Sequence, residues 1–99
     1  MKIYTISTTF SDLNLAKETT KNIITTKLAA CGQLQKIDSI YEWKGEVLDE
    51  LEYKVTFKTL KKQELVNFIL ENHSYEIPEI IIEEVETTEG YYKFVESNL

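Results

Sequence analysis

The stretch His73-Ser74-Tyr75-Glu76-Ile77-Pro78-Glu79-Ile80 runs directly into two further isoleucines, and it holds the only histidine and the only proline of the chain. Pro78 fixes its own φ and pushes the residue before it towards extended geometry, so this passage is predicted to be stiff and non-helical. The apolar run over residues 80–82 is typical of a buried strand. A polar cluster at the start of a strand suits a binding site, and it equally suits an ordinary helix-to-strand connection.

The composition indicates one globular domain spanning residues 1–99. Ninety-nine residues with 42% hydrophobic side chains are enough to bury a core without disulfides. The net charge is −6, and all eleven basic residues are lysines. Without arginine the chain lacks the planar fork that recognises phosphates and bases in two-point contacts. A nucleic-acid partner is therefore not expected.

The single cysteine, Cys31, cannot form an internal disulfide or a two-cysteine metal motif. This favours a reducing, cytoplasmic location. The chain opens directly on a strand-like run with no sign of a secretory leader, and no apolar run reaches membrane-spanning length. We therefore expect no membrane partner.

The hydrophobic patterning on either side of the opening stretch predicts alternating strands and helices. The first helix has an N-cap at Ser11 or Asp12 and a left-handed stop at Gly32. Uneven spacing of apolar residues in the second strand indicates a bulge. The expected strands cover residues 2–9, 33–43, 51–58 and 79–86, the expected helices residues 13–30, 61–72 and 87–99, and a long hairpin tip residues 44–50.

The order strand, helix, strand, strand, helix, strand is the ferredoxin-like split βαβ arrangement, an α+β fold. Right-handed crossovers place the first and third strands in the centre of the sheet. The isoleucines of the fourth strand put apolar side chains on both faces of an edge strand. In a single copy of the chain these side chains would be partly exposed to solvent. We therefore expect the chain to self-associate through its open sheet face and edges, with the hairpin contributing to the interface.

Several segments together resemble the CutA divalent-ion tolerance family, in that family's order and spacing. The resemblance implies a homotrimer whose sheets face inward and whose hairpins reach onto neighbours, similar in architecture to the P-II nitrogen regulators. It also implies binding of Cu(II) or another divalent cation, which folding does not require, and a cleft between subunits. The matching segments are Ala29-Ala30-Cys31, Ile40-Tyr41-Glu42-Trp43-Lys44-Gly45, Lys58-Thr59 and His73 to Ile80.

The sequence departs from the family pattern at five places. Thr8 stands where some members have a cysteine, and Asn72 stands where some have the first histidine of a pair. The remaining departures are Gly32-Gln33 in place of Val-Asn, Ser74 in place of proline, and Phe94 in place of tryptophan. These changes affect a metal site more than they affect the fold and the trimer.

The candidate metal ligands are His73, Glu76, Glu79 and Cys31. A neutral imidazole at His73 with Glu76 or Glu79 and water would suit Cu(II). Alternatively, His73 is a polar residue that ends a helix. Cys31 is a soft-metal ligand in one interpretation and a small buried hydrophobic residue in the other.

The candidate residues of the intersubunit cleft combine aromatic and basic side chains. The aromatic ones can stack on a ligand or anchor an interface. The lysines can hold an anion, or pair across a subunit boundary with the glutamates of the opening stretch. The set comprises Tyr41, Trp43, Lys44, Lys58, Tyr75 and Pro78.

We therefore expect a divalent-cation tolerance protein without enzymatic activity. The alternative is a P-II-like regulatory trimer that binds a small anionic metabolite through Lys44 and Lys58. An acylphosphatase-like enzyme would need a guanidinium, and a metallochaperone of this fold would need paired cysteines. The chain also shows no Ser/His/Asp triad or activated nucleophile.

Overall fold

The computed structural model describes all 99 residues and contains one four-stranded antiparallel sheet with three helices. The strand order β2-β3-β1-β4 confirms the predicted ferredoxin-like fold, with the first and third strands in the centre. The elements are β1 (Lys2–Phe10), α1 (Leu13–Thr25), β2 (Cys31–Trp43), β3 (Glu46–Thr59), α2 (Lys62–Asn72), β4 (Ile81–Glu86) and α3 (Glu89–Ser97).

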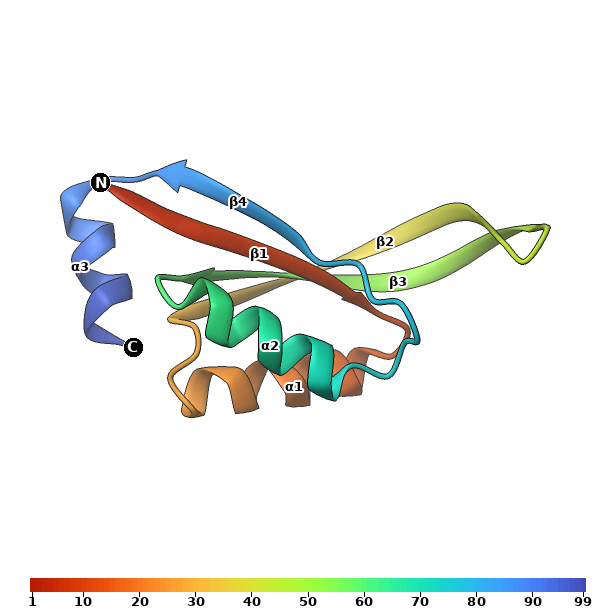
Figure 1. The fold of residues 1–99 in the computed structure, drawn as a ribbon, viewed down its shortest axis with the longest axis horizontal. Helices are drawn as coiled ribbons and strands as arrows, with labels where there is room; N and C mark the ends of the chain where they lie inside the picture. The colour runs from red at the N-terminus through yellow and green to blue at the C-terminus, as the bar shows by residue number, and fades with distance from the viewer.

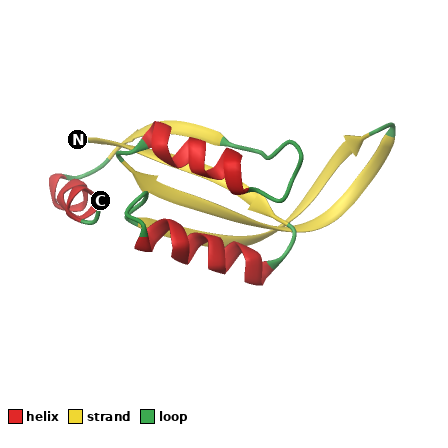
Figure 2. Ribbon diagram, turned by 60° about the horizontal axis from the view of Figure 1, so that its bottom comes forward, coloured by secondary structure: helices red, strands yellow, loops and turns green.

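Helices α1 and α2 lie side by side on one face of the sheet, and the hydrophobic core lies between these two layers (Figure 1 and Figure 2). Strict alternation along β1 and β3 turns every second side chain towards the helices. Helical spacing supplies the opposing residues from α1 and α2. The buried core consists of Ile6, Phe10, Ala16, Ile23, Ala29, Val55, Phe57, Leu65 and Ile69.

Helix α1 begins as predicted but ends earlier than expected. Asp12 is its N-cap and accepts a hydrogen bond from the backbone N–H of Leu15 at 2.8 Å. The helix ends at Thr25, and the left-handed residue is Lys27, with φ +64°. The predicted stop at Gly32 is therefore wrong. Gly32 instead lies in β2, where a Cβ would come within 2.6 Å of Thr20 Cγ2.

The β2–β3 hairpin is continuous, which corrects the predicted bulge and the predicted long tip. Thirteen successive pairs join the strands, from Cys31 opposite Lys58 to Trp43 opposite Glu46. Only Lys44 and Gly45 form the turn. Both have positive φ, +51° and +84°, as a type I′ turn requires. The paired strands therefore project beyond the helical layer and give the molecule its 46 Å long axis (Figure 1).

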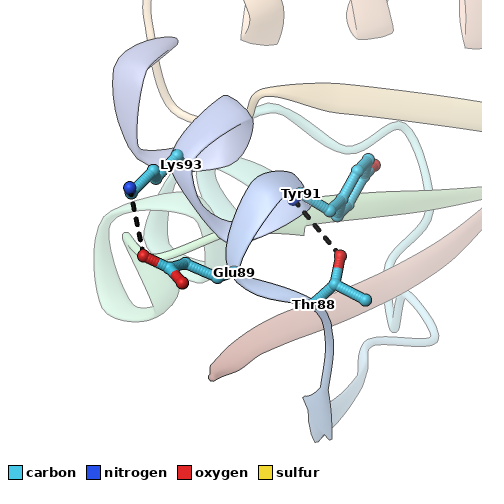
Figure 3. A network of polar contacts seen from close by, with 4 residues as sticks. All are labelled: Thr88, Glu89, Tyr91 and Lys93. Atoms are coloured by element: carbon cyan, nitrogen blue, oxygen red, sulfur yellow. Dashed lines mark hydrogen bonds and ion pairs between the residues drawn. The ribbon is translucent and has the colours of Figure 1, made fainter.

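The C-terminal part ties both chain ends to the sheet. Strand β4 begins at Ile81, two residues later than predicted, and the backbone N–H of Thr87 donates to the Met1 carbonyl at 2.7 Å. Thr88 caps α3 by accepting a hydrogen bond from the backbone N–H of Tyr91, and Lys93 pairs with Glu89 one turn apart at 3.1 Å (Figure 3). This helix is shorter at both ends than residues 87–99.

The sheet face away from α1 and α2 is mostly polar and has no helix over its middle. The β1–β3 register places Thr5, Ser7 and Thr9 on this face beside Lys58, Thr56 and Lys54. The outer edges of β2 and β4 are unpaired, since each strand has only one neighbour. On β4, Ile81 and Ile82 point to opposite faces and are 48% and 44% exposed, so the apolar edge expected from the sequence is present.

Candidate ligand groove

A groove of about 670 Å³ lies between the turn-side half of the β2–β3 hairpin and the loop that joins α2 to β4. We call it the hairpin groove. Half of its lining residues are hydrophobic, and none is basic. The lining comprises Ser39, Ile40, Tyr41, Trp43, Leu48, Glu50, Glu52, Ser74, Tyr75, Glu76, Ile77 and Glu79.

The hairpin register explains how these side chains meet. Ser39 lies opposite Glu50 and Tyr41 lies opposite Leu48, so their side chains share one face of the two-stranded ribbon. Trp43 and Glu52 follow on that same face because side chains alternate with a period of two. Pro78 stiffens the loop opposite. In Figure 1 this loop passes beside the point where the hairpin leaves the sheet.

Two tyrosine–glutamate hydrogen bonds organise the groove. Tyr75 Oη donates to Glu52 Oε2 at 2.6 Å, and Tyr41 Oη donates to Glu50 Oε1 at 2.7 Å. Burial and the bond to Glu52 raise the pKa of Tyr75 above its ordinary value of 10. The bond to Glu50 raises the pKa of Tyr41. Both phenols therefore stay protonated and donate to carboxylates at neutral pH.

Glu52 is the most deeply buried charged residue of the groove, with only 7% of its surface exposed. Its hydrogen-bond donor is the Tyr75 hydroxyl. The chain has two ion pairs, Lys2 with Glu84 and Lys93 with Glu89, and Glu52 takes part in neither. The Tyr75 hydroxyl therefore supplies the hydrogen bond that a buried carboxylate needs.

His73 does not line the groove, and both of its ring nitrogens are engaged within the chain. Its Nε2 lies 2.8 Å from the Thr9 carbonyl, and its Nδ1 accepts from the backbone N–H of Tyr75 at 3.0 Å. The ring stacks on Phe10 at a centroid distance of 4.7 Å. Burial lowers the pKa of His73 from 6.5, which favours the neutral imidazole. A metal at either nitrogen would have to replace one of these hydrogen bonds.

The predicted metal ligands do not converge within one chain. Glu76 and Glu79 line the groove, but His73 and Cys31 do not. Cys31 begins β2 opposite Lys58, which pairs with Thr5, whereas His73 contacts Thr9. Four residues along a strand correspond to roughly 13 Å. No three His, Cys, Asp or Glu side chains lie close enough together to hold a metal ion.

The predicted cleft residues divide between the groove and other surfaces. Tyr41, Trp43 and Tyr75 line the groove, whereas Lys44, Lys58 and Pro78 do not. The Lys44 ammonium lies over the Trp43 ring at 5.7 Å from its centroid, at the hairpin turn. Lys58 hydrogen-bonds to Gln33 on the open sheet face. The structure therefore brings the aromatic residues together without the lysines.

Sequence reasoning missed Glu50 and Glu52, the two carboxylates that hold the tyrosines. Glu50 falls within the predicted hairpin tip over residues 44–50, and Glu52 falls within the predicted strand over residues 51–58. The available signal was the even spacing of Leu48, Glu50 and Glu52. This spacing indicates a shared face with Tyr41 only when the two-residue turn, which sets the hairpin register, is known.

Comparison with known proteins identifies the family. Residues 4–98 match the sequence profile described as CutA1 divalent ion tolerance protein. The chain belongs to the CutA1 family. It is 31% identical over 93 residues to the divalent-cation tolerance protein CutA of Pyrococcus horikoshii, covering 91% of each chain. It is 37% identical over 75 residues to human Protein CutA, covering 73% of this chain and 42% of the human one.

Solved CutA structures share this fold. The chain is similar to CutA from Synechococcus elongatus with a TM-score of 0.94 at 25% identity, covering 98% of this chain and 89% of the other. It is similar to CutA1 from Pyrococcus horikoshii with a TM-score of 0.92 at 28% identity, covering 96% of each chain. The CutA1 assignment confirms the resemblance noted in the sequence.

CutA relatives occupy several compartments. One similar protein, from Arabidopsis thaliana, is described as chloroplastic, and one from Archaeoglobus fulgidus is described as periplasmic. No helix of this chain is long and apolar enough to cross a membrane. The cytoplasmic location predicted from the single cysteine remains a prediction.

Proposed function

We propose that this CutA1 family member is a non-enzymatic homotrimer that binds Cu(II) or a related divalent cation and contributes to metal tolerance. The observation that carries the proposal is the match to the divalent ion tolerance family over residues 4–98. The relatives are named for tolerance of divalent cations, and their names describe no reaction.

The exposed carboxylates at the rim of the hairpin groove support cation binding. Glu76 and Glu79 lie on the rim, and no lysine lines the groove to neutralise them. Carboxylate oxygens suit divalent cations, and Cu(II) also accepts nitrogen ligands. Since one chain does not assemble three ligands, we place a specific site where a second copy adds to this rim.

Exposed apolar side chains support self-association. Val47 is 76% exposed and Ile40 is 69% exposed, both on the projecting hairpin. They add to the exposed isoleucines on β4 and to the unpaired outer edges of β2 and β4. Stable interfaces bury surfaces of this kind, and unpaired strand edges offer backbone groups for pairing between chains.

Native mass spectrometry of the protein, first without metal and then with Cu(II), tests assembly and binding together. The proposal expects a trimer that takes up a defined number of copper ions. A Glu76→Gln and Glu79→Gln double variant should stay trimeric and lose copper uptake. The matched control is Glu83→Gln and Glu86→Gln, which removes two charges from β4 outside the groove.

A trimer that takes up no copper or other divalent ion would contradict the binding proposal and leave the assembly intact. A monomer at micromolar concentration would contradict the assembly. The P-II-like alternative gains no support from the groove, because neither Lys44 nor Lys58 lines it. An anionic metabolite would meet carboxylates there instead.

A further inference from the structure

The loop over residues 74–80 carries both rim carboxylates, Glu76 and Glu79, and lacks backbone support. Its residues form neither helix nor strand, and their backbone groups make no hydrogen bond to other backbone groups. The two carboxylates are exposed and take part in neither ion pair of the chain. A segment without backbone hydrogen bonds keeps one shape only where side chains hold it. The position of the rim therefore depends on the side chains that fix this loop.

His73 connects the loop to the sheet. Its Nδ1 accepts from the backbone N–H of Tyr75 at 3.0 Å, and its Nε2 lies 2.8 Å from the Thr9 carbonyl on β1. Because an amide N–H only donates and a carbonyl only accepts, the neutral ring carries its proton on Nε2. The stack on Phe10 fixes the plane of the ring. One imidazole therefore holds the residue next to Glu76 against β1.

The contacts of His73 leave no free nitrogen for a metal ion. Binding at Nδ1 would break the bond from the Tyr75 amide, and binding at Nε2 would displace the proton that faces the Thr9 carbonyl. Since His73 is the only histidine, a second copy of the chain brings the same occupied ring. The rim itself offers carboxylate oxygens, which suit divalent cations.

From these contacts we infer that His73 is a positioning residue of the cation site and not a ligand. It fixes the loop that presents Glu76 and Glu79, so the ion meets carboxylate oxygens and no imidazole nitrogen. The inference rests on the proposed function, because it assigns how the cation site of that proposal is held. It replaces the role of nitrogen ligand that the sequence analysis considers for His73.

Amide hydrogen exchange, resolved by NMR in the metal-free assembled protein, tests the positioning role without any metal. The Tyr75 amide should be protected, and His73→Ala should speed its exchange by about tenfold or more. His73→Gln should keep the protection, because glutamine offers one acceptor and one donor in place of the two ring nitrogens. Asn72→Ala is the matched control, since its amide donates to the Phe68 carbonyl within α2.

Unchanged exchange of the Tyr75 amide in His73→Ala would overturn the inference. If that variant does not fold, an unprotected Tyr75 amide in the unsubstituted protein would overturn it equally.

Pulsed EPR of the protein loaded with Cu(II) tests whether the ring is a ligand. Any signal from a coordinated imidazole would come from His73, the only histidine, and we expect none. His73→Ala should weaken copper binding about 10- to 100-fold, the usual effect of removing a group that orients metal ligands, and His73→Gln should recover it to within about threefold. An imidazole signal, or no recovery in His73→Gln, would overturn the inference. Failure of the unsubstituted protein to take up copper would contradict the proposed function instead, and exchange of the Tyr75 amide would then decide the role of His73.

Discussion

The hydroxyl of Tyr75, in the loop before β4, donates to the Glu52 carboxylate on β3 at 2.6 Å, and this bond joins the loop to the base of the hairpin. Tyr75 also contacts the ring of His73, with centroids 4.8 Å apart. One side chain therefore connects the groove to the residue that follows α2.

Replacing Tyr75 with phenylalanine keeps the ring and removes the donor to Glu52. Because a buried carboxylate then loses its hydrogen bond, we expect the free energy of unfolding to fall by about 1 to 3 kcal/mol. Urea denaturation followed by circular dichroism measures this. Tyr92→Phe is the control, since its hydroxyl makes no hydrogen bond within the chain. An equal loss in both variants would contradict the role assigned to the Tyr75–Glu52 bond.

His73 should make stability depend on pH below its ordinary pKa of 6.5. Burial lowers the pKa of His73 in the folded state, so below pH 6.5 the unfolded chain binds a proton that the folded chain resists. The contribution of neutral His73 to the free energy of unfolding is therefore complete above pH 6.5, and it is lost as the pH falls towards the pKa of His73 in the folded state. In His73→Phe, which keeps a ring on Phe10, the urea midpoint should lose this part of its pH dependence. An identical pH profile in both proteins would exclude His73 as its source.

Gly32→Ala should destabilise the fold through a steric clash. The added Cβ would lie 2.6 Å from Thr20 Cγ2 and 3.2 Å from the Phe57 ring, in a packed region. Overpacking of this kind costs about 1 to 3 kcal/mol, which a thermal melt detects. Gly90→Ala is the matched control, because no atom lies within 4 Å of its added Cβ. It lies in α3, where alanine should instead add up to about 1 kcal/mol.

Lys44→Asn should stabilise the hairpin turn. Lys44 holds φ at +51°, a conformation that asparagine adopts more readily than lysine. The substitution creates Asn-Gly, the preferred pair for a type I′ turn, so we expect a gain of about 0.5 to 1 kcal/mol in the free energy of unfolding. A lower melting temperature in the variant would show that the Lys44 contact with Trp43 outweighs the strain.

The architecture was predictable because periodicity and chain order reflect the backbone directly. Hydrophobic patterning predicts a strand over residues 51–58, which lies within β3, and a cap at Ser11 or Asp12 predicts the start of α1, where Asp12 is the cap. The predicted helix stop at Gly32 is wrong because glycine is favoured both in left-handed turns and where neighbouring atoms approach the backbone closely. Only the positions of Thr20 and Phe57 distinguish these two roles.

The candidate site was predictable only in part, because its residues come from segments far apart in sequence. The aromatic residues of the hairpin and Tyr75 were identified from the sequence, and the structure brings them to one groove. Glu52 was missed because a glutamate on a polar strand face normally meets water. Its burial arises from the loop around Tyr75, which local sequence patterns do not report.

Paired strands of the sheet differ in how far apart they lie in the sequence, and this difference favours an order in which the strand pairs form during folding. A two-residue turn joins β2 to β3, so their thirteen residue pairs can form one after another, starting at the turn. The β1–β4 ladder instead pairs residues 2–7 with residues 81–86, which loses far more chain entropy before any contact forms. The hairpin should therefore fold early and β4 should dock late, leaving its apolar edge exposed to other nascent copies until the last step of folding.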